Sequence, residues 1–300
     1  MHPILTYNSE VSFMDSYLPL HRANMRGKKN GNCVDLFSFI DKTPFEKVQL
    51  NFCKFLLGIK KSASNIAARA ELGCLPIENF IVSQSLLYLA RLHTENINPL
   101  LKEAFLLTKS LDCAGTYSWY TYIKNIHKDD NILKEIENCK TLKDLNSVKI
   151  HIKRSVEDKY KSLLENKIKS YDQSSKLFLY KNIKLNLEKE FYLKFHDFSI
   201  RKCFTKLRLS DHSLEIERGR YFKIPRENRL CRNCNVIESE EHFLIHCKLY
   251  INLRNKLVQD LNCKIEDITV SKLLNPSSIE HVKYIGSFLK QSLELRAKEA

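Results

Sequence analysis

The sequence predicts a mainly α-helical protein, and three observations lead to this expectation. Glycine and proline number only seven each in 300 residues, which is too few for the turns of a β-sandwich or barrel. Apolar residues recur at the three- and four-residue spacing of a helix face along most of the chain. Several of these periodic stretches begin at proline or at a residue that caps helices.

The first half of the chain divides into short helices. Residues 1–42 are expected to be an irregular lead-in, with a basic, turn-like segment at residues 26–32. A helix is predicted over residues 44–59, with Thr43 as its cap and Gly58 near its end. Further helices are predicted at residues 64–72, 76–92, 99–110, 118–126 and 131–139. Residues 43–140 are therefore expected to form one helical domain.

The second half is more basic. A long lysine-rich helix with one apolar stripe is predicted over residues 142–169, and a shorter basic helix over residues 200–209. The last predicted helices lie near residues 240–261 and 278–295. We expect residues 141–228 to be a basic helical linker region and residues 263–300 a C-terminal helix.

Charge is concentrated in the middle of the chain. The net charge is +14, and residues 141–237 alone carry 23 Lys and Arg against 12 Asp and Glu, an excess of 11. Such a field attracts polyanions, of which RNA and DNA are the commonest in cells. A solvated basic helical surface without a ligand explains the charge equally well.

The lengths of the apolar stretches and the pattern of cysteines indicate where in the cell the protein is found. No apolar stretch approaches the roughly 20 residues that cross a bilayer, and no signal peptide follows Met1, so we expect no membrane partner and a cytoplasmic or nuclear location. The ten cysteines are scattered, several inside apolar helical patterns, which favours reduced thiols over a disulfide framework.

One motif is specific. Cys231, Cys234, His242 and Cys247 have the spacing C-x2-C-x7-H-x4-C. Zinc prefers four tetrahedral sulfur and nitrogen ligands, and a closed set of four makes a structural site with no position left for a reacting water. We expect one structural Zn²⁺ in a zinc-knuckle segment at residues 229–262; the alternative is that these are ordinary core residues.

The second histidine of this segment complicates the ligand set. On an uninterrupted α-helix, residues five apart such as His242 and Cys247 would lie about 140° apart around the axis. His246, one helical turn after His242, is therefore an alternative ligand.

A basic run with two aromatic residues, residues 218–229, directly precedes the motif. Cations neutralise phosphates, and aromatic faces can stack on unpaired bases. Tyr221 and Phe222 are more simply explained as core residues beside the metal loop, whereas phosphate contact is the preferred interpretation of the arginines. The nucleic-acid-binding candidates are Lys206, Arg208, Arg218, Arg220, Tyr221, Arg226, Arg229 and Arg232.

The same segments resemble a known family. Residues 207–221, residues 224–234 with their Ile-Pro-Arg-Glu-Asn-Arg-Leu-Cys-Arg-Asn-Cys, and Glu240-Glu-His-Phe-Leu-Ile-His-Cys247 with Tyr250 closely resemble the zinc-knuckle region of LINE-type non-LTR retrotransposon reverse transcriptases. Upstream, residues 7–11, 52–59, 70–73 and 75–77 look like the stretch that follows the polymerase palm in those proteins. The resemblance covers nearly the whole chain.

The resemblance implies a mostly helical C-terminal region that helps to bind template RNA or target DNA. It implies Cys231, Cys234, His242 and Cys247 as the ligands, which favours His242 over His246. The aromatic-x-Asp-Asp turn of the polymerase is missing, because the only adjacent aspartates, Asp129-Asp130, stand in a polar segment. Neither the family's endonuclease nor a Pro-Asp-x-Asp nuclease motif is found. We therefore expect a non-catalytic tail, truncated or domesticated, that acts on RNA or DNA and takes any reverse transcriptase activity from a separate protein.

Other classes of function remain open. An enzyme has little support, because the chain has no glycine-rich phosphate loop and no recognisable catalytic constellation. A zinc-stapled helical scaffold for protein interactions would bind its partner with little dependence on salt, unlike a phosphate-binding surface. An inert truncated fragment of an element would still fold if its core were intact.

Overall fold

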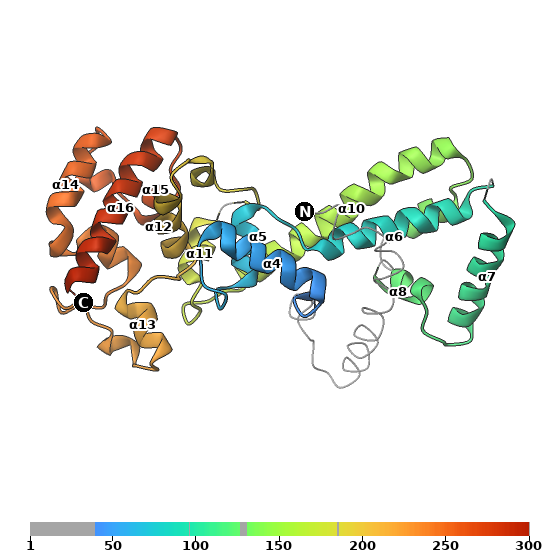
Figure 1. The fold of residues 1–300 in the computed structure, drawn as a ribbon, viewed down its shortest axis with the longest axis horizontal. Coiled ribbons are helices and arrows are strands. Elements are labelled where there is room, and N and C mark those ends of the chain that lie inside the picture. The colour runs from blue at the N-terminus through green and yellow to red at the C-terminus, as the bar shows by residue number, and fades with distance from the viewer. Residues whose placement is uncertain (1–39, 96, 127–130, 185, 300) are drawn as a thin grey trace. The chain divides into compact units, whose positions relative to one another are not determined.

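The computed structural model describes residues 40–95, 97–126, 131–184 and 186–299, and within them every regular element is helical (Figure 1). The only extended pairing in these ranges is an isolated antiparallel bridge between Leu230 and Ile237. The predicted mainly α-helical class is confirmed. Most of the predicted lead-in at residues 1–42 lies outside the described residues, which begin at Ile40. The basic turn at residues 26–32 and Asp129-Asp130 also lie outside them.

The chain forms two compact units, and each is built from two separate stretches of sequence. Of the described residues, one unit comprises residues 40–50 together with residues 75–163, and the other comprises Asn51–Cys74 together with residues 164–299. The boundaries fall inside two helices, α4 (Pro44–Leu57) and α10 (Leu142–Lys169). This division differs from the five consecutive segments expected from the sequence, because a chain that returns to an earlier unit leaves no mark in local composition.

The first unit is organised around α6 (Ile77–His93). Its buried residues lie on all sides of the helix, and it packs against α7 (Pro99–Cys113), α8 (Trp119–Ile126) and α9 (Ile132–Glu137). A central position explains why this stretch is apolar all round, as the sequence indicated. By contrast, α7 buries only Phe105.

The second unit is centred on α16 (Ile279–Glu299), which packs against α12 (Phe198–Arg208) and α14 (Ile251–Asp260). Gly286 permits the close approach of α12 and α16, because a Cβ atom at this position would lie 2.3 Å from Cγ2 of Ile200. The remaining helices of this unit are α5 (Asn65–Leu72), α11 (Phe178–Ile183), α13 (Glu215–Tyr221) and α15 (Val270–Leu274).

A buried ionic network ties α12 to α5. The side chain of Arg208 is fully buried, and its Nε donates to Oε1 of Glu71 over 2.6 Å. Its Nη2 lies 2.8 Å from Oε1 of Glu190, and its Nη1 donates to the carbonyl of Leu274 over 2.7 Å. The hydroxyl of Tyr192 also donates to Glu71. A buried charge is tolerated only when it is paired and hydrogen-bonded in this way.

The helix predictions succeed except around the metal motif. The predicted long helix over residues 142–169 coincides with α10. A continuous helix near residues 240–261 is wrong, because the chain forms a π-helical turn at His242–His246, an extended residue at Cys247 and a 3-10 turn at Lys248–Tyr250 before α14 begins. Helices α11, α13 and α15 were not predicted from the sequence.

Hydropathy along the helices bears on membranes. Among the described helices, none is by itself long and apolar enough to span a bilayer, and only the consecutive, bent pair of α5 and α6 passes that test of length and composition when the two are taken together.

Candidate metal centre

A tight turn brings together the thiols of Cys231 and Cys234. The amide of Cys231 donates to the carbonyl of Val236 over 2.7 Å, and the amide of Asn235 donates back to the carbonyl of Cys231 over 2.8 Å. Asn235 adopts a left-handed conformation with φ of 55°, which asparagine tolerates better than most residues. The C-x2-C spacing thus folds into a knuckle in which both sulfurs face the same side.

The other two residues come from the π-helical turn. The amide of Cys247 donates to the carbonyl of His242 over 2.7 Å, which is the i to i+5 bond of a π-helix. Cys247 then leaves the turn with an extended backbone. The wider turn places residues five apart on a common face, so the H-x4-C spacing needs no substitute ligand.

The four side chains lie close enough to hold a metal ion. One ligand atom from each of Cys231, Cys234, His242 and Cys247 lies within 4.8 Å of all the others. The sulfur of Cys247 is 3.8 Å from the sulfur of Cys231 and 3.8 Å from that of Cys234. A disulfide would need about 2.05 Å, so these are free thiols grouped around a common centre.

Histidine geometry favours His242. Its Nε2 is buried and makes no hydrogen bond to any residue that the structure describes, so this nitrogen is available to bind a metal. The side chain of His246 is 63% exposed, and its Nε2 lies 4.0 Å from a carboxylate oxygen of Glu241. The open alternative of His246 as ligand is therefore not supported.

Burial and hydrogen bonding set the protonation of these groups. Burial raises the pKa of Cys247 to about 12, whereas at Cys234 the effect of burial is outweighed by hydrogen bonds from the Lys248 backbone and the neighbouring thiols, which lower the pKa. Burial lowers the pKa of His242, so its imidazole stays neutral, as ligation requires. A cation at the centre would favour the thiolate forms by direct attraction.

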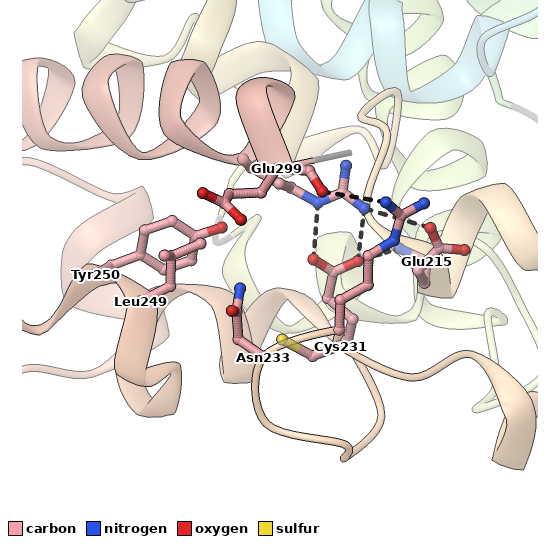
Figure 2. A pocket seen from close by; sticks show the side chains of 9 residues that line it. Glu215, Cys231, Asn233, Leu249, Tyr250 and Glu299 are labelled. Carbon is pink, nitrogen blue, oxygen red and sulfur yellow. Dashed lines mark hydrogen bonds and ion pairs between the residues drawn. The ribbon is translucent and has the colours of Figure 1, made fainter.

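Two buried arginines support the site through hydrogen bonds. Arg254 donates to the carbonyls of Leu244 and Cys247 over 3.0 and 3.1 Å, which fixes the end of the π-helical turn. Arg296 of α16 donates two 2.7 Å bonds to the carboxylate of Glu238, between the knuckle and the turn. Both residues line the small pocket beside Cys231 and Glu215 that Figure 2 shows. Helix α14 thus holds the π-helical turn, and α16 holds the segment that joins this turn to the knuckle.

The predicted nucleic-acid-binding residues fall into three groups. Arg208 is buried in its ionic network, so its assignment as a phosphate contact is wrong. Lys206, Arg220 and Arg229 are half-buried. Arg218, Tyr221, Arg226 and Arg232 are exposed, although Arg218 lies 3.1 Å from Glu215 and Arg232 donates to the backbone of Glu299.

The two aromatic residues of the basic run are at the surface. Tyr221 is 83% exposed and Phe222 is 62% exposed, so the expectation that they belong to the core is wrong. Tyr221 is the last residue of α13 and Phe222 is its C-cap, and this helix was not predicted from the sequence.

Comparison with known proteins gives no further identification. Neither the family models, nor the curated proteins, nor the solved structures contain a match to this chain.

Proposed function

We propose that the metal is a structural Zn²⁺. A tetrahedral ion with Zn–S bonds of about 2.3 Å separates two thiolates by about 3.8 Å. Both sulfur distances to Cys247 have this value. Three thiols and one imidazole are also a donor set that zinc prefers over the oxygen-seeking Mg²⁺ and Ca²⁺. Four protein ligands complete the coordination shell, so the ion stabilises the fold and performs no hydrolysis.

We infer that the chain is a non-catalytic nucleic-acid-binding protein. One observation carries this proposal: a segment of exposed cations and aromatic rings, residues 218–226, is joined directly to the metal knuckle. Cations neutralise the phosphate backbone, and the excess of 11 positive charges in residues 141–237 adds a long-range attraction. The ion's role is then to hold the loop that presents this surface.

The family resemblance supports the same proposal. The resemblance is most specific over residues 45–80 and 200–250, and the second stretch includes both the candidate metal ligands and the exposed basic segment. We propose that the chain corresponds to the post-polymerase region of a LINE-type reverse transcriptase. Its partner would be RNA or DNA.

The first experiment measures metal and binding on the same samples. Protein purified without chelator is expected to contain one zinc per chain, and to bind RNA or DNA with an affinity that falls steeply between low and moderate salt. Cys234→Ser should lose the zinc, loosen residues 229–250 in hydrogen exchange, and weaken binding at least ten-fold. Cys113→Ser, a change at an exposed cysteine outside the site, is the matched control.

Two results would contradict the proposal. If wild-type protein contains no bound metal, the proposal of a structural zinc is wrong. If zinc occupancy is full but neither nucleic acid shows salt-dependent binding, the proposed nucleic-acid function is wrong. The zinc-stapled scaffold for protein interactions is then the better explanation.

A second candidate function rests on α7, whose leucines face solvent. Leu100 is 74% exposed, Leu107 is 65% exposed and Leu106 is 55% exposed, a surface that monomeric proteins seldom leave uncovered. A helix of this kind is suited to a protein partner. Such binding would depend little on salt, and Leu100→Glu with Leu107→Glu should abolish it while leaving zinc and nucleic-acid binding unchanged.

A further inference from the structure

Two aromatic rings form an exposed pair at the end of α13. The rings of Tyr221 and Phe222 lie 5.2 Å apart, edge to face, at an interplanar angle of 87°. Their exposed fractions, 83% and 62%, are unusual for adjacent large aromatic residues, whose burial would normally stabilise a core. We call this pair the aromatic platform.

The backbone beneath the platform is fixed. Lys223 adopts a left-handed conformation with φ of 57°, its amide donates to Arg220, and the amide of Ile224 donates to the carbonyl of Gly219 over 2.8 Å. These two bonds form the Schellman motif that ends many helices. Glycine is the usual residue at the left-handed position, so a lysine there is strained.

Arg229 braces the same loop from inside. Its Nε donates to the carbonyl of Ile224 and its Nη1 to the carbonyl of Ile216, each over 2.9 Å. The side chain passes over Gly219, where a Cβ atom would lie 2.5 Å from Cγ of Arg229. This arginine is therefore a positioning residue for the platform, and two of its nitrogens are already bonded to the protein.

The brace is continuous with the metal knuckle. The carbonyl of Arg229 accepts a 2.9 Å hydrogen bond from the amide of Glu238, and the next residue, Leu230, forms the bridge with Ile237. Cys231 follows immediately. The position of Arg229, and so of the loop that carries the rings, therefore depends on an ordered knuckle.

We propose that the aromatic platform stacks on unpaired bases, so that the ligand of this surface is single-stranded RNA or DNA. Every base has a flat π-face, and rings held rigidly by a short loop receive bases at little entropic cost. Exposed cations flank the rings in the sequence, Arg218 before them and Lys223 and Arg226 after them. The bases of a duplex are already stacked on one another and offer these rings no faces. The inference rests on the proposed nucleic-acid function and specifies its substrate.

The test uses the full chain and two fluorescent probes, a 20-nucleotide uridine-rich RNA strand and the same strand paired with its complement. Wild-type protein is expected to bind the single strand at least ten-fold more tightly than the duplex. Replacing both rings by alanine, Tyr221→Ala with Phe222→Ala, should reduce single-strand affinity roughly ten- to a hundred-fold and duplex affinity less than three-fold. The variant with exchanged rings, Tyr221→Phe with Phe222→Tyr, should recover most of the single-strand affinity that the double alanine variant loses.

Two further variants separate stacking from general surface effects. Phe55→Ala removes a ring that is 75% exposed on α4, outside the basic segment, and should leave both affinities unchanged. Gly219→Ala keeps the rings and all charges but displaces the Arg229 brace. It should weaken single-strand binding several-fold while the zinc content stays at one per chain.

Each alternative result has a definite meaning. Equal affinity for strand and duplex, or no effect of the double alanine variant, would overturn the single-strand inference and leave the proposed function standing. Absence of binding to both probes would overturn the proposed function itself. Binding to anionic phospholipid vesicles that competes with the RNA and needs both rings would overturn the inference in favour of a membrane surface.

Discussion

Arg208 and Arg226 stand in one basic stretch of sequence, yet the structure gives them opposite environments. Arg208 is fully buried and paired with Glu71, which lies 137 residues earlier in the chain. Arg226 is exposed, in the 3-10 turn between α13 and the metal knuckle. The difference shows that an excess of positive charge does not identify the cations free to meet a polyanion, because the fold supplies some of them with distant carboxylates.

The aromatic residues divide in the same way. Tyr192 is buried, stacks on Phe204 and donates its hydroxyl to Glu71, whereas Tyr221 is exposed beside Phe222. One region uses its arginine and tyrosine to join helices, and the other presents the same residue types to solvent. Making the same substitution in each region is the clearest way to test this contrast.

The largest effect is expected at Arg208. Arg208→Met leaves the carboxylates of Glu71 and Glu190 buried without their main partner, which should lower the free energy of unfolding by about 3–5 kcal/mol. Urea denaturation followed by circular dichroism measures this loss. Arg226→Met, the matched change at the surface, should alter stability by less than about 0.5 kcal/mol. Similar losses in the two variants would contradict the assignment of separate roles.

Much of the fold and the ligand set could be predicted from local pattern. The boundaries of α10 follow from a long apolar stripe, and the start of α5 at the Ser64 cap and its end at Gly73 follow from capping chemistry. The candidate cysteines follow from spacing, because Cys231 and Cys234 must share a tight turn to reach one ion. Spacing left His242 and His246 as alternatives, and the family resemblance favoured His242.

Three features could not be predicted, and each depends on nonlocal or irregular structure. Helical arithmetic assumed an α-helix between His242 and Cys247, but the chain forms a π-helical turn that suits their spacing. The position of Tyr221 depends on α13, a helix of seven residues that is too short to show a period. The burial of Arg208 depends on Glu71, and no local signal connects residues so far apart in sequence.

An intermediate effect is expected at Arg254, which is buried beside the metal centre. Arg254→Ala removes the donors to the carbonyls of Leu244 and Cys247, so metal affinity should fall about ten- to a hundred-fold, as for other residues that orient ligands. Competition with a chromophoric zinc chelator measures the affinity. Lys256→Ala, at an exposed position of the same helix, is the control. Unchanged affinity in Arg254→Ala would show that the π-helical turn holds Cys247 without support.

The smallest effect, and the most specific to the surface region, is expected at Arg226. Arg226→Gln removes one exposed charge without disturbing any buried group, so the slope of log affinity against log salt should become shallower by about one unit or slightly less. Titration of the single-stranded probe at four salt concentrations gives this slope. Arg229→Gln should instead weaken binding by a similar factor at every salt concentration, because two of the nitrogens of Arg229 bond to the carbonyls of Ile224 and Ile216. Equal changes of slope in the two variants would mean that Arg229 also meets a phosphate, and that positioning and binding are not divided between these residues.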